Sequence, residues 1–330
     1  MAAKLLMTDL GTPLWHVDRP SRSEDSLADR TFRSPNPAVE LALLGILASL
    51  WGASYSFIKV GVETIPPVTL IAARTLIAGC ILLLVMRLRG ITLPKDRGLW
   101  LSLLVQACLN SVVPFTLIAW GEQIVDAGLA TILNSTSPIF TFLLAVALVR
   151  HEAVTARKLL GVVAGLAGIC LIVGFEALGG LGDALIAQLA IVAATVSYAG
   201  AAIFGRRFKG LDPIVPAAGS MLCGAAILIP ASLAIDQPWQ LAPSTGSVPA
   251  LLALSVFSTA LAFTIYFRLL HTLGSVGTTS QAYLRVPIGV AIGVLFLGET
   301  LASTAWLGLA CVMLGVAAMA IPPRKPALQT

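Results

Sequence analysis

The side chains with the clearest chemical potential in this sequence are polar residues placed inside long apolar segments. Arg285 lies ten residues past Ser275, which at 1.5 Å per residue puts it about 15 Å along its segment. A charge at that depth of a membrane is costly unless it faces protein, water or a ligand. A structural arginine would bond to helix carbonyls or to Asn, Gln and Tyr side chains. A functional one would bind a carboxylate or another anionic group of a substrate.

Other polar side chains repeat at helical spacing along six of the apolar segments, so that each set shares one helical face. Aromatic residues flank these faces and would add apolar contact. The predicted substrate-binding residues are Trp51, Tyr55, Asn110, Asn134, Tyr198, Tyr266, Gln281 and Arg285. For any single Ser, Thr or Asn the alternative is an interhelical hydrogen bond, which contributes about 1 kcal/mol or less. Six such faces on matching segments favour a shared polar cavity instead.

Two prolines occupy corresponding places midway along apolar segments. Pro138 and Pro287 each remove a backbone donor and loosen a helix at mid-membrane. Each is either a packing kink or the hinge of a gate, and the sequence leaves these two interpretations open. Arg74, in the second apolar segment, is expected about 10 Å from the outer end of its span, where its side chain can snorkel to the interface. Lys59 is expected to reach the membrane interface.

Several kinds of catalytic and coupling chemistry have no recognisable residues in this chain. No Asp or Glu falls near the middle of an apolar segment, and carriers that couple to protons usually need such a group. No phosphate-binding loop or hydrolase motif is present. The five cysteines, Cys80, Cys108, Cys170, Cys223 and Cys311, lie in different segments and predict neither a metal site nor a disulfide framework. We therefore expect no enzyme activity and no cofactor.

Composition places these segments in a membrane. The chain has 330 residues, of which 57% are hydrophobic and 11% charged, with a mean hydropathy of +0.92. A soluble domain carries about twice that charged fraction. The apolar runs are continuous and long enough for membrane helices, which need roughly 20 residues, so an all-α integral membrane protein is predicted. We place ten spans near 40–60, 68–87, 99–120, 127–149, 156–175, 184–205, 214–235, 249–268, 275–297 and 303–321.

The ten spans fall into two similar halves. A proline pair, Pro66 and Pro67, follows the first span, and Asp212-Pro213 follows the sixth. A Glu-bearing turn closes the fourth span at Glu152 and the ninth at Glu299. An odd number of crossings per repeat inverts the second copy in the membrane, which is a transporter architecture. The predicted domains are a first five-helix repeat at 38–178 and a second, inverted one at 182–322, with tails at 1–37 and 323–330.

Charge distribution sets the predicted topology. Lys and Arg cluster in alternate connections and in both tails, whereas the other connections carry mostly Asp and Glu. By the positive-inside rule both termini are cytoplasmic, and the connection near 237–247 is outside. The N-terminal 37 residues are polar without an apolar core, which predicts a disordered cytosolic tail. A basic surface that alternates in this way is a topology signal, so no nucleic-acid partner is expected.

Two five-helix repeats with a mid-helix proline in the fourth span and a Glu-bearing turn after it resemble the EamA repeats of the drug/metabolite transporter superfamily. The matching stretches are Trp51–Tyr55, Ser137–Gly161 and Val286–Gly308, and the resemblance covers about residues 38–322. Within that superfamily the chain is similar to amino-acid and metabolite exporters, including the aromatic amino-acid type. The resemblance implies a central cavity, alternating access and a bacterial inner (cytoplasmic) membrane.

The predicted function is export of small metabolites, with amino acids favoured. Because no titratable group or nucleotide site is found for coupling, we expect a facilitator, or uniporter. Two alternatives stay open: a broad drug or toxicant efflux transporter, and a membrane-embedded enzyme acting on lipid substrates. The expected partners are a small-molecule substrate and membrane lipid. The sequence does not decide between a monomer and a homodimer.

Overall fold

Helices make up the regular structure of the described residues, which contain no strand, as the sequence predicts. The structure is a computed structural model that describes residues 37–148, 155–173, 182–208, 210–273 and 281–320. The helices of the first half of the chain are α1 (Pro37–Val62), α2 (Pro67–Leu88), α3 (Arg97–Ala107), α4 (Val113–Gly121), α5 (Ala127–Asn134), α6 (Ser137–Leu148) and α7 (Ala156–Val173). The helices of the second half are α8 (Asp183–Phe204), α9 (Ile214–Ile235), α10 (Ser247–Ser255), α11 (Ala262–Thr272), α13 (Gln281–Phe296) and α14 (Ser303–Ala320).

Seven stretches of the described residues are long and apolar enough to cross a membrane. They are Ala38–Val62, Pro67–Leu88, Arg97–Gly121, Ala127–Ala147, Asp183–Phe208, Ile214–Ile235 and Ser247–Tyr266, and each coincides with one of the ten predicted spans. The remaining three predicted spans contain the shorter helices α7, α13 and α14. The tails and the turn with Glu152 lie outside the described residues.

Two of the long spans contain a π-helical segment near their middle. The segment η1 (Cys108–Val112) joins α3 to α4, and η5 (Val256–Leu261) joins α10 to α11. These are the third and eighth predicted spans, which occupy corresponding places in the two halves. π-Helical turns are rare and occur frequently at functional sites.

The fourth predicted span is broken, whereas the described part of the ninth is continuous. Turn residues separate α5 from α6 just before Pro138, which becomes the second residue of α6. The hydroxyls of Ser135, Thr136 and Ser137 donate to carbonyls three residues earlier, and these bonds satisfy acceptors that the break frees. Pro287 lies inside the uninterrupted helix α13. The two prolines therefore act on the backbone in different ways.

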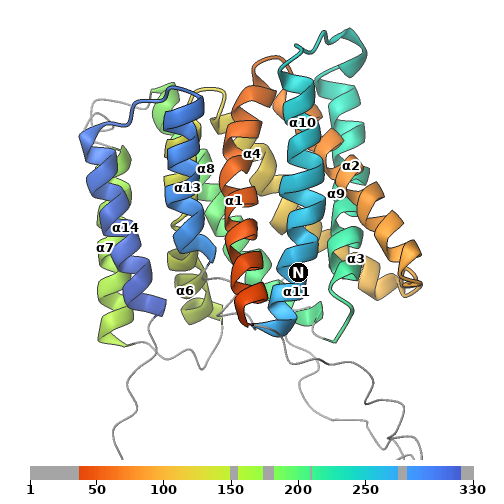
Figure 1. Ribbon diagram of the computed structural model, residues 1–330, viewed down its shortest axis with the longest axis horizontal. Helices are drawn as coiled ribbons and strands as arrows, with labels where there is room; N and C mark the ends of the chain where they lie inside the picture. The colour runs from red at the N-terminus through yellow and green to blue at the C-terminus, as the bar shows by residue number, and fades with distance from the viewer. Residues whose placement is uncertain (1–36, 149–154, 174–181, 209, 274–280, 321–330) are drawn as a thin grey trace, which may run out of the picture. The chain divides into compact units, whose positions relative to one another are not determined.

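Glycines allow several helices to approach closely. In Figure 1, α7 and α14 run side by side at one edge of the view. A Cβ atom added at Gly308 would lie 2.7 Å from the carbonyl oxygen of Gly168, and one at Gly315 would lie 2.9 Å from the nitrogen of Gly165. Similarly, a Cβ at Gly52 of α1 would lie 3.0 Å from the Arg285 carbonyl oxygen of α13. Small residues thus bring backbones together, as in membrane helix pairs generally.

The principal apolar core gathers residues from both halves of the chain. Ile71 and Ile132 of the first half pack in one cluster with Ile191 and Val290 of the second. Helices α2 and α9 pack together, as do α5 and α13, and α4 packs on α8. Among the predicted binding residues, Tyr55 and Tyr198 belong to or pack against this core, and Asn134 of α5 is buried beside Tyr55.

Candidate functional site

The interior site is centred on a contact between Tyr55 and Asn134. Both side chains are buried, and Asn134 Nδ2 donates a hydrogen bond to Tyr55 Oη. Tyr55 belongs to α1, and Asn134 is the last residue of α5, at the break in the fourth span. Two residues that sequence analysis assigned to the site from separate spans therefore meet.

Tyr198 and Arg285 belong to the same cluster. The Tyr55 and Tyr198 hydroxyls both interact electrostatically with Arg285 and with Arg74. Arg285 is half-buried, and its Nε atom has no hydrogen-bond partner among the described residues. The cluster thus combines two arginines with two tyrosines, a set suited to holding an anionic and partly apolar ligand.

Arg74 corrects a prediction, because it does not snorkel to the membrane interface. Arg74 is only 3% exposed, its Nε donates to Thr259 Oγ1 at 2.8 Å, and its guanidinium carbon lies 3.7 Å from the centroid of the Phe115 ring. The Phe115 ring in turn packs edge-on against Tyr198, with centroids 6.3 Å apart. Thr259 belongs to the π-helical segment η5. Arg74 is therefore a site residue that the depth argument missed.

Trp51 and Tyr266 lie together in a separate aromatic group. Their ring centroids are 5.4 Å apart, and Phe263 packs on both. This group joins α1 to α11. The structure thus pairs these two predicted binding residues with each other.

The last two predicted binding residues stand apart from the Tyr55–Asn134 contact. Asn110 is half-buried in η1 and makes no side-chain hydrogen bond among the described residues. Gln281 is buried at the first residue of α13, and its Oε1 atom has no partner in the described part of the chain. No contact shown by the structure adds either residue to the central cluster.

Several buried polar atoms lack a protein partner within the described residues. Besides Arg285 Nε and Gln281 Oε1, they include Ser56 Oγ, Ser111 Oγ, Thr116 Oγ1 and both carboxyl oxygens of Glu122. Buried polar groups in native structures are nearly always hydrogen-bonded to protein, water or a ligand. Such a concentration on α1, η1, α4 and α13 indicates an interior that holds water or a polar ligand.

One end of the bundle, which we call the Glu122 end, is closed by charged side chains that bind backbone groups. Lys59 Nζ donates to the carbonyl oxygens of Glu122 and Val125, each at 2.9 Å. The Glu299 carboxylate accepts from the backbone nitrogens of Ala127 and Gly128 at 2.7 and 2.8 Å, so it caps the N-terminus of α5. Lys59, expected at the interface, thus holds the turn between α4 and α5 inside the protein.

The turn that carries Glu299 depends on a glycine. Gly298 has a φ of +67°, in the left-handed region that favours glycine, and the Glu299 nitrogen donates back to the Gly293 carbonyl at 3.2 Å. The positive φ of Gly298 lets the chain fold back onto the end of α13. It directs the Glu299 carboxylate toward α5, where Gly128 leaves room for it.

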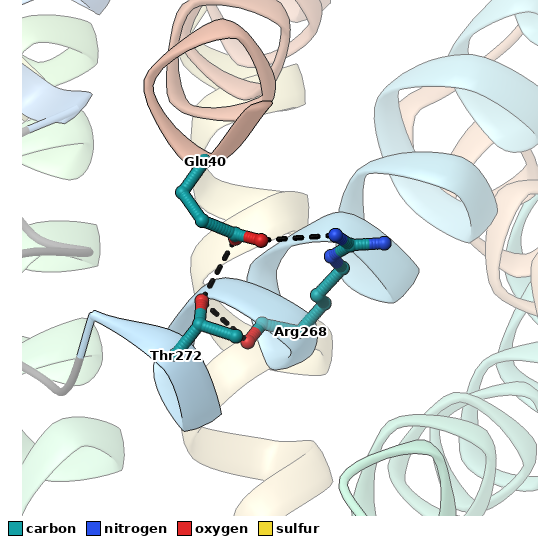
Figure 2. Close-up of polar contacts among 3 residues, drawn as sticks. All are labelled: Glu40, Arg268 and Thr272. Atoms are coloured by element: carbon teal, nitrogen blue, oxygen red, sulfur yellow. Dashed lines mark hydrogen bonds and ion pairs between the residues drawn. The ribbon is translucent and has the colours of Figure 1, made fainter. Parts of the chain in front are cut away.

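The opposite end, which we call the Glu40 end, is held by an ion pair between the two halves of the chain. Figure 2 shows Glu40 of α1 between Arg268 and Thr272 of α11. Arg268 Nη2 donates to Glu40 Oε1 at 2.9 Å, and Thr272 Oγ1 donates to Glu40 Oε2 at 2.8 Å. Glu40 is 1% exposed, whereas the Arg268 side chain is 55% exposed. The contact joins the first predicted span to the eighth.

Apolar helices that surround a buried polar cluster define a multi-pass membrane protein with a polar interior, as in carriers. The model of the EamA-like transporter family matches residues 40–174 and 185–321. These two matches cover most of the chain, and the protein belongs to this family. It is a membrane transporter with two EamA repeats, and the family implies a small-molecule substrate.

Similar proteins include transporters from several bacteria. The chain is 29% identical over 295 residues to an uncharacterized inner membrane transporter, YedA, of Escherichia coli, covering 87% of this chain and 94% of that protein. It is 27% identical to the uncharacterized transporter YoaV of Bacillus subtilis, covering 83% and 94% of the two chains. It is 25% identical to a probable terminal-alkyne amino-acid exporter of Streptantibioticus cattleyicolor, covering 81% and 88%. A crystal structure aligns with a TM-score of 0.62 at 16% identity, over 86% of this chain and 98% of that one, which shows a shared fold.

Proposed function

We propose that this transporter exports small metabolites, with amino acids as the favoured class, through the interior around Tyr55, Asn134 and Arg285. The observation that carries the proposal is the unpartnered Nε of Arg285, which interacts electrostatically with the buried Tyr55 and the half-buried Tyr198. A substrate carboxylate would satisfy that donor, and charge-assisted pairs of this kind are strong. The tyrosine rings would contact the apolar part of the substrate.

Alternating access between two inverted five-helix repeats is the mechanism we propose. Corresponding contacts in the two halves support it. Ser197 of the sixth span donates to the Leu109 carbonyl of the third at 2.9 Å, and Ser258 of the eighth donates to the Leu50 carbonyl of the first at 2.7 Å. A two-fold relation between the repeats exchanges these two pairs of spans, with the donor on the sixth span in one contact and on the eighth in the other. It also exchanges the π-helical segments η1 and η5. The domain limits 38–178 and 182–322 follow from the same relation.

Operation as a facilitator in the inner (cytoplasmic) membrane, with both termini cytoplasmic, completes the proposal. Among the described residues, Arg74 and Arg285 form no ion pair with a carboxyl group, and the buried carboxyl group of Glu122 lies just beyond the end of its span. A rocking carrier of that kind moves substrate down its own gradient. We propose Pro138 and Pro287 as gate hinges. The case is stronger for Pro138, which follows a break between two helices, than for Pro287, which lies inside a continuous helix.

Uptake of a labelled amino-acid panel into proteoliposomes tests the function. We expect saturable equilibration of at least one amino acid, and loss of transport in Arg285→Gln with unchanged insertion and thermal stability. Leu284→Gln, at a neighbouring exposed position of α13, is the matched control and should retain transport. Equal transport by Arg285→Gln would return this arginine to a structural role.

Efflux of drugs or toxicants is the second candidate, and the same vesicles distinguish it. The buried Arg74 and the half-buried Arg285 disfavour a cationic drug in this interior. Transport of a cationic dye without any amino-acid transport would therefore contradict the proposed substrate class. No constellation for catalysis on lipids is found among the described residues, and amino-acid transport would exclude that alternative as the main activity.

A further inference from the structure

Glu122 has an environment that its place in the sequence does not predict. It follows directly after the candidate span Arg97–Gly121, in a connection expected to be exposed. In the structure Glu122 is 0% exposed, and neither of its carboxyl oxygens has a hydrogen-bond partner among the described residues. Buried carboxylates are ordinarily paired, so this side chain needs an explanation beyond packing.

The face of α4 that carries Glu122 is directed toward the interior site. Phe115, seven residues earlier and so on nearly the same helical face, supports Arg74 and packs on Tyr198. Ser111 precedes Phe115 by one turn and is also buried without a partner among the described residues. The carboxyl group therefore ends a line of polar and aromatic groups that runs from the site to the Glu122 end.

The charged and titratable groups around Glu122 come from four other parts of the chain, and none of them binds its carboxyl group in this conformation. Lys59 of α1 uses two of its three donors on backbone carbonyls, and Glu299 binds the N-terminus of α5. Arg74 of α2 binds Thr259. Tyr55 and Tyr198 lie within electrostatic range. Because neither carboxyl oxygen of Glu122 accepts from Lys59 here, a pair between the two groups requires the ammonium group to move.

Burial is the largest influence on the ionisation of Glu122. Desolvation raises the pKa of this carboxyl group well above the ordinary value of 4.5, and Glu299 adds to the increase, while Lys59 and Arg74 oppose it. The neutral acid is thus the form that suits the observed, unpartnered position. An ionised carboxylate would instead favour a conformation that brings it to Lys59 or to water.

We propose that Glu122 is a proton-binding site that controls opening of the Glu122 end. When a proton from the adjacent solution binds a carboxylate oxygen, the neutral acid is buried and the turn between α4 and α5 is held closed. When the acid returns that proton to water, the carboxylate pairs with the ammonium group of Lys59, which stays protonated. That pairing withdraws Lys59 from the carbonyls of Glu122 and Val125 and loosens the turn.

This inference rests on the proposed carrier function and adds regulation by pH to it. The substrate gradient still sets the direction of net transport, while the proton sets how often this end opens. The sign follows from linkage: a raised pKa in the closed conformation means that closure is favoured below that pKa and weakens as the pH rises toward and through it.

Infrared difference spectroscopy of the full chain in lipid bilayers tests proton binding without any substrate. The titration starts at a pH at which ordinary exposed carboxyl groups are already ionised. On raising the pH from there, the wild type should lose the carbonyl band of a protonated carboxylic acid and gain a carboxylate band. Glu122→Gln should lack this change. Glu63→Gln, which alters an exposed carboxylate just beyond α1, is the matched control and should keep it. A change that is absent from the wild type, or equal in Glu122→Gln, would overturn the proposal.

Two further measurements separate proton binding from a merely structural role. Lys59→Met should move the midpoint of the band change upward, because it removes the cation that most opposes the rise in the pKa of Glu122. Spin labels at exposed Gln123 and Thr300, in a background without native cysteines, should show a longer distance at alkaline pH in the wild type and a pH-independent short distance in Glu122→Gln. An unmoved midpoint together with a pH-independent distance in the wild type would contradict the switch. Because neither readout uses substrate, failed amino-acid transport would count against the proposed function alone.

Discussion

Replacing Glu299 by alanine should release the Glu122 end. In the structure the carboxylate spans two backbone donors, with 2.7 Å between Oε1 and the Ala127 nitrogen and 2.8 Å between Oε2 and the Gly128 nitrogen. These donors belong to the first turn of α5, where nitrogens have no partner within the helix. Alanine removes both bonds and the negative charge that balances the helix dipole, while the backbone of the turn is kept.

The size of the effect follows from the geometry. Hydrogen bonds to a charged group contribute about 1.5–3 kcal/mol each, so the two bonds set an upper limit of about 3–6 kcal/mol. Glu299 is half-exposed, and water can reach the freed nitrogens and replace part of this. We therefore expect a loss of about 2 kcal/mol of closure free energy, which is about a 30-fold shift toward the open end, since each 1.4 kcal/mol is a factor of ten.

Distance measurements between spin labels at Gln123 and Thr300 report this shift directly. The Glu299→Ala protein should populate a longer distance than the wild type under the same conditions, and Glu299→Gln, which keeps one acceptor oxygen, should lie between the two. Glu63→Ala removes an exposed carboxylate elsewhere and should leave the distribution unchanged. If Glu299→Ala gave the wild-type distribution while the protein remained folded, the capping argument for closure would be refuted.

Three further predictions address helix packing, the other end of the bundle and topology. Gly52→Ala would place a Cβ 3.0 Å from a backbone oxygen of α13 and should lower the free energy of unfolding by about 1–3 kcal/mol. Gly45→Ala on the same helix, with open space around it, should be neutral or slightly stabilising. Equal effects of the two substitutions would contradict the close crossing. Glu40→Gln and Arg268→Gln should each lower the thermal stability, and the double variant should lose little more than either, because both remove the same ion pair; full additivity would argue against that coupling. A periplasm-active reporter fused after Pro243 should be active and one at the C-terminus inactive, and the reverse would overturn the predicted topology.

Hydropathy and helical spacing were sufficient to predict the all-helical class and much of the interior. Tyr55 flanks the polar face of the first span and Asn134 lies on the polar face of the fourth, and the structure brings the two residues into contact. Helix backbones approach closely between Gly165 and Gly315 and at Gly289. These features are repeated at helical period along single segments, so one-dimensional patterns carry them.

The residues that the sequence misplaced all lie near span ends or at irregular backbone. Counting residues from a span end put Arg74 within reach of the interface, and Glu122 falls in a connection after the third span, but both side chains are buried. Depth along one helix says nothing about what packs beside it. The π-helical segments were also missed, because one extra residue in a turn leaves the apolar composition unchanged. The unpaired carboxyl of Glu122 was therefore visible only once the helices were placed.

The two ends of the bundle are closed by contacts of different strength, and this difference determines which end opens more readily in the absence of substrate. At the Glu122 end, Lys59 and Glu299 together make four bonds to backbone groups, and the Gly52 crossing lies on the same helix as Lys59. At the Glu40 end, the described closure is an ion pair with a half-exposed arginine and a threonine hydroxyl, and water weakens such a pair. Opening the Glu40 end therefore costs less. If that end faces the cytoplasm, as the charge distribution predicts, a carrier at rest is readier to receive substrate from inside, as an exporter requires.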